Sequence, residues 1–478
     1  MAGLLVAGTS SDAGKSLVAA GLCRAFARRG LRVAPFKAQN MSNNSMVCAD
    51  GSEIGRAQYL QALAAGVEPS SVHNPVLLKP GTDRRSFIVL RGQPAGTLEA
   101  GEYVGGRTRL AEAAFAAYAE LDASYDLVVA EGAGSPAEIN LRAGDYVNFG
   151  LARRFGLPVV LVGDIDRGGV LASVYGHWAI VDDADRATLA GYLVNKFRGD
   201  QSVLDPGLEE LTARTGLPCF GVLPWLDQVW LDSEDALAFA KWPRLPGRAG
   251  TLRVAAIRFP RISNATDLDA LAAEPGLDVF ATATPADIES ADLVVLPGSR
   301  STLADLDWLR RLGLADALAR RAAAGRPILG ICGGYQMLAE VIDDPVESAR
   351  GTEPGLGLLP VRVRFSPEKV LGRPRGSWRG HEVVGYEIHH GVVEPTGGEP
   401  FLDGVRLGNT WGTIWHGAFE NDAFRRAWLT ELAATVGSSW TPAEDQPGFA
   451  ERRTQMLDVL ADALEEHVDL DALLALTR

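Results

Sequence analysis

Cysteine is scarce in this chain of 478 residues, and its scarcity excludes two kinds of architecture. The four cysteines are Cys23, Cys48, Cys219 and Cys332. They show no metal-ligand spacing, and they are too few and too scattered for a disulfide framework. Because sparse cysteines fit a reducing compartment, we expect a cytoplasmic protein.

Long hydrophobic runs and basic clusters are also missing. No apolar run approaches the roughly 18 residues of a membrane span. The first six residues lack a basic region with a cleavage site, so no signal peptide is expected. Basic residues number 46 against 60 acidic ones, a net charge of −14, and no Lys/Arg block interleaved with aromatics stands out. Neither a membrane nor a nucleic acid is expected as a partner, and an oligomer remains possible.

Short apolar runs that alternate with helical patterns predict the fold class. Such runs occupy residues 31–35, 127–130, 159–162 and 190–194, as in buried parallel strands. A stretch rich in Pro, Gly and Arg then precedes a new set of strands. The predicted fold is α/β, with a doubly wound first sheet. The predicted domains are residues 1–242, a linker at 243–251, a second α/β domain at 252–440 and a C-terminal helical segment at 441–478.

Residues 8–16 follow a short apolar strand and form a glycine-rich loop of the phosphate-binding kind. Backbone N–H groups of such a loop, including that of Thr9, hold phosphates at a helix start, where Gly14 permits the turn. Lys15 neutralises the phosphates and Ser16 can ligate Mg²⁺. Five residues separate Gly8 from Gly14 instead of the usual four, and this longer loop resembles that of dethiobiotin synthetase, which uses ATP to phosphorylate a carboxylate.

Polar residues end the neighbouring predicted strands. With Ser16 and Asp50, Glu131 is a predicted Mg²⁺ ligand, because ligands bind at the carboxyl edge of open α/β sheets; alternatively it is only a helix cap. Asp164 is predicted to contact the acceptor substrate or a metal, with a structural cap as the alternative. Asn195 is predicted to pair with the adenine edge of ATP, or else is an exposed strand-end amide.

A cluster of amides follows the next strand end. Lys37 is a predicted contact of the nucleotide, and Gln39, Asn40, Asn43 and Asn44 follow it within seven residues. A loop of this composition at the sheet edge is suited to hydrogen-bond a substrate with many polar groups. The alternative is an ordinary Asn-rich turn.

The segment 330–335, Gly-Ile-Cys-Gly-Gly-Tyr, carries the clearest catalytic signal. It places Cys332 between an apolar strand and a helical run, which is the pattern of a nucleophile elbow with sulfur as the nucleophile. A thiolate at a helix N-terminus is stabilised by the helix dipole and free N–H groups. We therefore predict that Cys332 attacks a carbonyl carbon.

A thiol nucleophile needs a base and an oxyanion hole. His416 is the predicted base, and His381, His389 and His390 are its competitors. The predicted oxyanion donors are the backbone N–H groups at Gly333 and in the turn that contains Gly298. Glutamine is the predicted substrate, with Gln336, one helical turn after Cys332, and Glu387 as predicted contacts.

Four further stretches, taken with these motifs, resemble the cobyric acid synthase family, glutamine-dependent amidotransferases of cobalamin biosynthesis. The resemblance covers essentially the whole chain, and its most specific stretches are residues 37–45, 53–58, 74–80 and 131–141. It implies a synthetase domain of dethiobiotin-synthetase type followed by a class I glutamine amidotransferase domain. It also implies that Cys332 is the nucleophile and that His416 is its partner.

The reaction implied by the resemblance uses ATP, Mg²⁺ and glutamine. Four peripheral carboxylates of adenosylcobyrinic acid a,c-diamide, b, d, e and g, would be amidated to give adenosylcobyric acid. Many class I enzymes carry a carboxylate two residues after the histidine, but Ala418 stands there in this chain. Glu420 is a possible substitute, so the third member of the triad is left open.

Two alternatives remain at this stage. The first is a related amidotransferase, either cobyrinic acid a,c-diamide synthase or a system that amidates a cell-wall lipid. The second is a nucleotide-switch ATPase of the partitioning kind. Those switches carry an extra lysine early in the phosphate loop, where this chain has Ser10 and Ser11, and they have no cysteine elbow.

Overall fold

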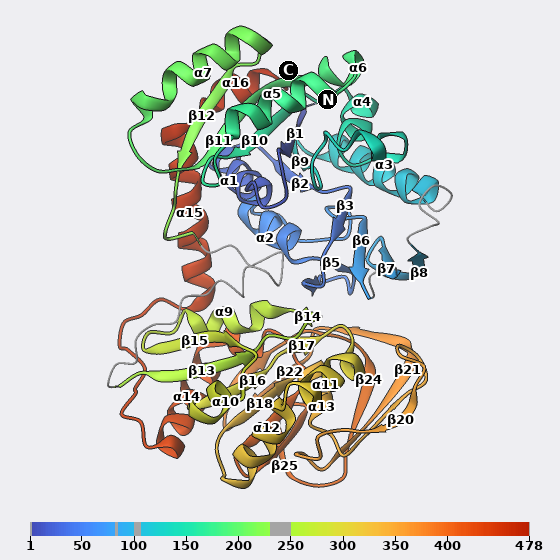
Figure 1. Ribbon diagram of the computed structural model, residues 1–478, viewed down its shortest axis with the longest axis vertical. Coiled ribbons are helices and arrows are strands. Elements are labelled where there is room, and N and C mark those ends of the chain that lie inside the picture. The colour runs from blue at the N-terminus through green and yellow to red at the C-terminus, as the bar shows by residue number, and fades with distance from the viewer. Residues whose placement is uncertain (1, 82–84, 100–106, 230–249, 478) are drawn as a thin grey trace. The chain divides into compact units, whose positions relative to one another are not determined.

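The structure is a computed structural model that describes residues 2–81, 85–99, 107–229 and 250–477 (Figure 1). Two compact units divide the chain. The first comprises Met1–Met41, Ser52–Leu231 and Arg453–Arg478, and the second comprises Ser42–Gly51 and Asp232–Arg452. Residues 243–249 of the predicted linker lie outside the described part of the chain.

A six-stranded parallel sheet forms the centre of the first unit. Its order is β12-β11-β10-β1-β9-β2, with β1 in the interior and later strands added on either side of it. This is the predicted doubly wound arrangement, and the α/β fold class is confirmed. The strands are β1 (Gly3–Gly8), β2 (Val33–Phe36), β9 (Leu127–Glu131), β10 (Val159–Asp164), β11 (Leu189–Phe197) and β12 (Cys219–Pro224).

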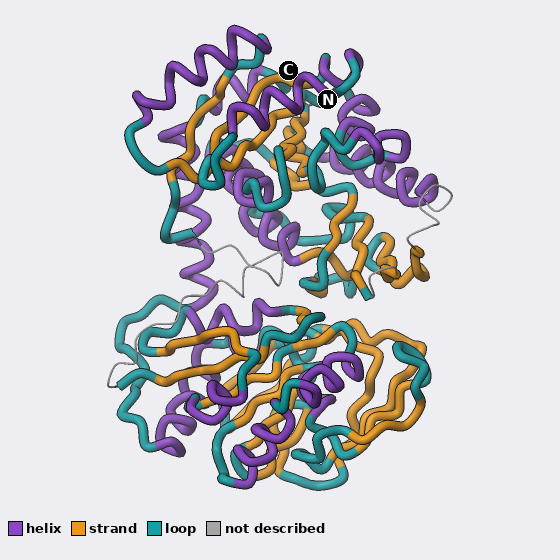
Figure 2. Tube along the Cα trace, viewed as in Figure 1, coloured by secondary structure: helices purple, strands orange, loops and turns teal. Residues whose placement is uncertain are grey.

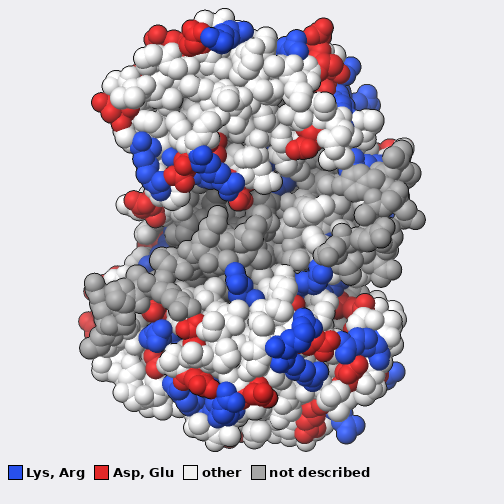
Figure 3. All heavy atoms as spheres, viewed as in Figure 1, with Lys and Arg blue, Asp and Glu red and all other residues white. Residues whose placement is uncertain are grey.

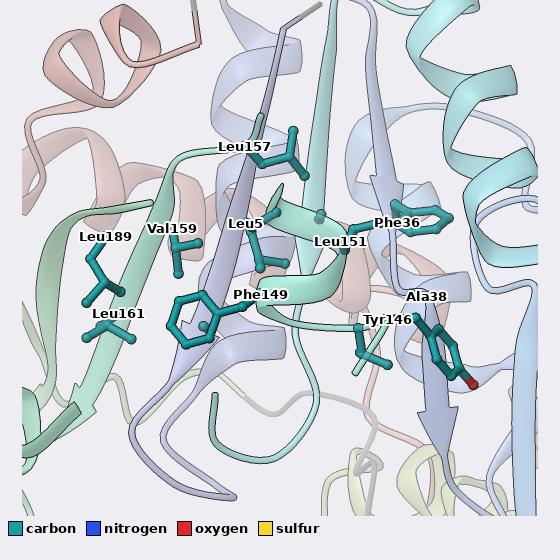
Figure 4. Close-up of a cluster of buried hydrophobic side chains, with 14 of the residues drawn as sticks. Leu5, Phe36, Ala38, Tyr146, Phe149, Leu151, Leu157, Val159, Leu161 and Leu189 are labelled. Atoms are coloured by element: carbon teal, nitrogen blue, oxygen red, sulfur yellow. The ribbon is translucent and has the colours of Figure 1, made fainter. Parts of the chain in front are cut away.

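Helices cover both faces of this sheet because its strands are apolar on both sides (Figure 2). Leu5 and Val159 point to one face, where they pack with Phe36, Phe149 and Leu161 in a buried cluster (Figure 4). That face carries α3 (Arg107–Ser124), α4 (Phe149–Phe155), α5 (Val170–Ile180) and α7 (Gln201–Thr215). The other face carries α1 (Lys15–Arg28) and α2 (Arg56–Ala65).

The C-terminal helices also belong to this second face. They are α15 (Phe449–His467), red in Figure 1, and α16 (Leu470–Ala475). The Leu460 and Leu464 side chains lie against Gly21 of α1, and Arg24 of α1 pairs with Asp458 at 2.8 Å. From Arg453 onward, the C-terminal helical segment predicted from the sequence therefore completes the core of the first unit.

A smaller sheet, of order β3-β6-β7-β8, lies in the same unit. Its strands are β3 (Gln39–Met41), β6 (Val76–Pro80), β7 (Arg85–Leu90) and β8 (Gln93–Glu99), with β5 (Glu53–Gly55) nearby in sequence. Buried charged residues gather around it: Lys79 donates to Glu53 at 2.6 Å, and both side chains are almost fully buried.

The second unit is built on a seven-stranded sheet of order β15-β13-β16-β18-β27-β26-β25. Its first five strands are parallel and its last two are antiparallel. The strands are β13 (Leu252–Ile257), β15 (Leu277–Thr282), β16 (Leu293–Leu296), β18 (Ile328–Ile331), β25 (Glu399–Phe401), β26 (Gly404–Leu407) and β27 (Thr410–Thr413). Helices α9 (Asp269–Ala272), α10 (Pro285–Ser290), α11 (Thr302–Arg311), α12 (Leu314–Ala323), α13 (Gly333–Met337) and α14 (Asp422–Val436) surround it.

A second sheet, of order β20-β19-β21-β24, completes this unit. It consists of β19 (Val341–Asp344), β20 (Gly351–Pro354), β21 (Val361–Gly372) and β24 (Glu387–Pro395). Two short pairs accompany it, β14 (Ile262–Ser263) with β17 (Gly298–Ser299) and β22 (Arg375–Trp378) with β23 (His381–Val384). Strand β4 (Ser45–Val47) is the N-terminal segment that joins this unit.

Acidic and basic side chains are interspersed on the face drawn in Figure 3. Many of them are paired, as Arg350 is with Asp307 and Arg320 with Glu289. Within the described residues, none of the helices has the length and apolar character needed to span a membrane.

Candidate active site

Cys332 occupies the turn between β18 and α13. Its φ of 49° lies in the left-handed region, which a non-glycine residue seldom adopts. The turn is held because the Cys332 N–H donates to the Thr413 carbonyl at 2.8 Å, and the side chain is 5 % exposed. The strained strand-to-helix turn predicted from the sequence is therefore present, with the thiol buried at its apex.

His416 follows β27, and it is the histidine whose side chain contacts the Cys332 thiol. It is hydrogen-bonded to Cys332 on one side, and its Nδ1 lies 2.6 Å from Asp267 Oδ2 on the other. Asp267 also accepts from the Gly417 N–H at 2.8 Å through its second oxygen, so the carboxylate is fixed at both ends. Both side chains are almost fully buried. Cys332, His416 and Asp267 therefore form a thiol, an imidazole and a carboxylate in series, the arrangement that nucleophilic catalysis by a thiol uses.

Asp267 is the triad member that the sequence did not supply. It lies in the short helix Ala265–Leu268, which follows β14, 149 residues before the histidine. The hydrogen bond that His416 Nδ1 donates to Asp267 orients the ring, and the carboxylate would compensate the charge of the imidazolium. Glu420, the candidate from the sequence, lies at the end of the 3₁₀ helix Ala418–Glu420, whereas the carboxylate that bonds to His416 Nδ1 is that of Asp267.

The charges around His416 shift its pKa strongly. Burial alone would lower that pKa, but the Asp267 carboxylate and the Cys332 sulfur outweigh it and raise the pKa from 6.5 to about 10. The imidazole is therefore protonated at neutral pH. A protonated His416 in contact with the sulfur can give its proton to a leaving group.

A pH dependence of stability follows from this shift. Because the folded-state pKa of His416 exceeds its unfolded value of 6.5, its protonation stabilises the fold fully below pH 6.5, and the effect is lost as pH rises through about 10. We expect the difference in unfolding free energy between the wild type and Asp267→Asn to shrink from pH 6 to pH 10, as measured by urea titration. A difference that stayed constant over that range would contradict the assignment.

The predicted oxyanion residues meet at the same place. A Cβ at Gly298 would lie 3.1 Å from His416 Cε1 and 2.6 Å from the Ser263 carbonyl oxygen, so a side chain cannot be accommodated. A Cβ at Gly333 would lie 2.7 Å from the backbone nitrogen of Ser299. The turn at 298–299 thus lies against His416 and against the start of α13, and its role as an oxyanion hole stays a prediction.

The predicted glutamine contacts have partners inside this unit. Gln336 is buried, its Oε1 accepts from the Thr302 hydroxyl at 3.1 Å, and its Nε2 donates to the Gly391 carbonyl at 3.3 Å. Glu387 lies 3.3 Å from His389 Nε2. Both amide ends of Gln336 are therefore used in linking α11, α13 and β24, and its contact with glutamine stays a prediction.

Tyr386 is a further residue of the site that the sequence did not single out. Its ring stacks on that of His416 with centroids 5.3 Å apart, and the two backbones exchange N–H···O bonds of 2.9 Å. Of the competing histidines, His389 bonds to Gly391 and Glu387, and His390 bonds to the Ser366 carbonyl. The stacked ring helps to fix His416 in the plane that the thiol and Asp267 need.

The phosphate loop of the first unit has the expected local geometry. Gly14 begins α1 with φ 102°, and a Cβ there would collide with the Asn195 side-chain amide. Asn195 Nδ2 donates to the Ala13 carbonyl at 3.0 Å, and Lys15 Nζ donates to the Ser10 carbonyl at 3.0 Å. The Thr9 N–H donates to the Val162 carbonyl of β10 at 3.0 Å, so the prediction that this N–H holds a phosphate is wrong: the group continues the strand pairing of β1. The strand, loop and helix therefore follow in order, and Asn195 braces the loop from β11, which is separated from β1 by β10.

Glu131 lies at the centre of a buried polar cluster beside this loop. The carboxylate has no exposed surface and accepts from Ser16 Oγ at 2.7 Å, Lys37 Nζ at 2.8 Å and Gln61 Nε2 at 2.7 Å. Gln58 Nε2 approaches it at 3.4 Å. Three of the predicted residues are thus brought together, and Gln58 and Gln61 of α2 join them.

The residues of this cluster fit the way nucleotide-bound Mg²⁺ is held. That ion takes a loop hydroxyl and one carboxylate from the protein and its remaining ligands from phosphates and water, as Ser16 and Glu131 would allow. Within the described residues, no group of three or more His, Cys, Asp and Glu side chains could hold a metal by itself. Asp50 is exposed and belongs to the second unit, whereas Ser16 and Glu131 belong to the first.

The predicted substrate residues divide between the units at Ser42. In the first unit, Asn40 Nδ2 donates to Gln58 Oε1 at 2.9 Å, and Gln39 accepts from the Tyr146 hydroxyl. Asn40 is therefore linked through Gln58 to Glu131. Asp164, which ends β10, accepts from Lys196 Nζ at 2.7 Å.

In the second unit, Asn43 and Asn44 lie in the segment that joins it from the N-terminal sequence. Asn44 Oδ1 accepts from the Ala265 N–H at 3.3 Å, and Asn264 Oδ1 accepts from the Ser45 N–H at 2.9 Å. The Asn43 side-chain oxygen is buried without a hydrogen-bond partner among the described residues. These two hydrogen bonds therefore attach the segment to Asn264 and Ala265, which immediately precede Thr266 and Asp267 in the sequence.

Comparison with known proteins matches both units. Residues 4–237 match the CobQ/CobB/MinD/ParA nucleotide binding domain, and residues 253–424 match the CobB/CobQ-like glutamine amidotransferase domain. The chain is 65 % identical over its full length to a cobyric acid synthase of Cutibacterium acnes, covering all of that protein. Similar proteins of the same name from Mycolicibacterium vanbaalenii and Streptomyces avermitilis are each 56 % identical, with 96 % and 95 % of their lengths covered.

The chain belongs to the cobyric acid synthase family. The resemblance stated from the sequence motifs is thereby confirmed, and so are the two kinds of domain it implied. The protein is an enzyme of this type, with a nucleotide-binding domain and a glutamine amidotransferase domain. The roles of individual residues in the family reaction remain proposals, which the geometry above supports.

Proposed function

We propose that this chain amidates four peripheral carboxylates, b, d, e and g, of adenosylcobyrinic acid a,c-diamide to give adenosylcobyric acid, using ATP and glutamine. The observation that carries the proposal is the Cys332–His416–Asp267 series, present in a chain whose first unit holds a phosphate loop. A nucleotide-switch ATPase has no use for a buried thiol with a base and a carboxylate.

The glutaminase half follows from the second unit. Cys332 Sγ would attack the amide carbon of glutamine, and the N–H groups near Gly298 and Gly333 would stabilise the oxyanion. His416 would give its proton to the departing nitrogen, so the C–N bond breaks, ammonia leaves and a glutamyl thioester remains. Water activated by His416 would then release glutamate and restore the thiol.

The synthetase half follows from the first unit. Lys15 and the loop N–H groups would hold the phosphates of ATP, and the γ-phosphoryl group would pass to a corrinoid carboxylate to give an acyl phosphate and ADP. Bound Mg²⁺, held through Ser16 and Glu131, would neutralise charge on the phosphates. Ammonia would then attack the acyl carbon and expel phosphate, which leaves the amide.

The test is direct conversion of the corrinoid. Purified protein is incubated with adenosylcobyrinic acid a,c-diamide, MgATP and glutamine, and the corrinoid is followed by mass spectrometry. Each acid-to-amide conversion lowers the mass by about 1 Da, and four successive steps are expected. An unchanged corrinoid mass, with ATP and glutamine both present, would overturn the proposed acceptor.

A further inference from the structure

We propose that the ion pair between Arg300 and Glu347 binds the amino-acid head group of glutamine. Arg300 would take the α-carboxylate, and Glu347 would take the α-ammonium group. This inference rests on the proposed glutaminase function, because it names the part of the site that recognises the end of the substrate remote from the reacting amide.

The position of Arg300 ties the pair to the nucleophile. Arg300 directly follows Ser299, whose backbone nitrogen lies 2.7 Å from where a Cβ on Gly333 would be. Gly333 in turn follows Cys332. Arg300 therefore directly follows the turn predicted to supply the oxyanion hole, and a glutamine whose amide lay in that turn would need a partner for its head group close by.

Glu347 is held in place from its own side. Asp344 Oδ1 accepts from the N–H groups of Val346 and Glu347, at 3.1 and 2.7 Å, and Asp344 Oδ2 accepts from Ser348 at 2.9 Å. The loop after β19 is thereby rigid, and its carboxylate meets the guanidinium of Arg300. A preorganised pair loses little entropy when a ligand replaces part of it.

The exposure of the pair separates it from the structural pairs of the same unit. The side chains of Arg300 and Glu347 are 12 % and 15 % exposed. Arg425 and Glu274 are 2 % and 1 % exposed, closed to any ligand, and the Arg350–Asp307 pair is an open surface pair at 36 % and 34 %. The Arg300–Glu347 pair is thus desolvated enough for strong charged hydrogen bonds and still open to a small molecule.

The surrounding charges suit a zwitterion. His390 also lies near the pair. Burial lowers its pKa most, Glu347 and the hydrogen bond with the Ser366 carbonyl raise it, and Lys369 and Arg300 lower it, so that its pKa lies below the ordinary 6.5. The charged side chains that act on this ring are Arg300, Lys369 and Glu347, so both signs of charge are present, as an α-carboxylate and an α-ammonium group require. Gly391, next to His390, accepts from Gln336 one turn after the nucleophile.

The experiment compares two chloroketones that alkylate Cys332 when its sulfur displaces chloride. One is L-2-amino-4-oxo-5-chloropentanoate, which carries the head group of glutamine, and the other is chloroacetone, which lacks it. We expect Arg300→Gln and Glu347→Gln to raise the concentration for half-maximal labelling by the first reagent about tenfold or more. Labelling by chloroacetone, read by mass spectrometry, stays unchanged, and Arg350→Gln is the control that changes neither.

The exchange Arg300→Glu/Glu347→Arg distinguishes recognition from a structural role. It restores an ion pair but reverses the places of its charges, so head-group recognition stays lost. Recovery of labelling by the amino-acid reagent in this exchanged variant, or equal losses with both reagents in the single variants, would overturn the inference. Wild-type Cys332 that reacts with neither reagent would instead overturn the proposed glutaminase.

Discussion

Asp267→Asn is expected to lower glutamine hydrolysis by about two to four orders of magnitude, while amidation from free ammonia is unchanged. Asn can still accept from the Gly417 N–H, but its amide donates toward His416 Nδ1 and favours the wrong tautomer. It also removes the charge that raises the pKa of His416. The rate of glutamate release from glutamine, with ATP and corrinoid present, measures the effect.

The matched control for Asp267 is Glu420→Gln. Glu420 is the carboxylate nearest in sequence to His416 on its C-terminal side, and it would be the third member if the triad were read from spacing alone. Its replacement is expected to leave glutamate release within about twofold of wild type. A large loss in Glu420→Gln with a normal rate in Asp267→Asn would reverse the assignment.

Lys15→Met is expected to lower the rate of corrinoid amidation by about three orders of magnitude or more, with either glutamine or ammonia as the nitrogen source. Lys15 starts α1 at the phosphate loop, and the methionine side chain keeps much of its length without the charge. ATP-dependent appearance of the amide, followed with saturating ammonia, is the measurement.

Arg32→Gln is the control for Lys15→Met, because Arg32 forms an exposed pair with Asp126 in the same unit. It should amidate like wild type. Since Lys15 also donates to the Ser10 carbonyl, thermal unfolding of the Lys15→Met protein is compared with wild type. A folded Lys15→Met protein that amidates normally from ammonia would contradict the phosphate-site assignment.

The parts of the site that could be predicted from sequence are those with a local signature. Cys332, Lys15, Ser16 and Glu131 each stand where an apolar strand ends and a turn or helix begins, and the structure places them there. His416 follows a strand too, and it meets the thiol because β27 is the parallel neighbour of β18. Strand neighbours, however, cannot be read from spacing along the chain.

Asp267 was missed for that reason. It follows β13 and β14 and reaches His416 only because of the strand order in the second unit. The signal that could have found it is the polar run Ser263 to Asp267 after the first strand of the second domain, the same kind of strand-end signal that singled out Asp164. The search for a carboxylate was instead confined to the residues just after the histidine.

Local sequence patterns also could not predict to which unit the C-terminal helix and the amide-rich stretch belong. The amphipathic face of α15 is visible in the sequence, but its partner is not. The partner is α1: Leu464 of α15 packs against Gly21 of α1, and an ion pair between Arg28 and Asp462 also links the two helices. The amide-rich stretch likewise reads as a single loop, whereas Asn40 belongs to one unit and Asn44 to the other.

The most direct test of the central claim is the corrinoid assay with Cys332→Ala, supplied with glutamine or with ammonia. If the two units divide the chemistry as proposed, the variant gives no mass change with glutamine and four steps of about 1 Da with ammonia. Amidation by the variant from glutamine alone would contradict the role of Cys332, and failure with ammonia in a folded protein would contradict the separation of the two sites.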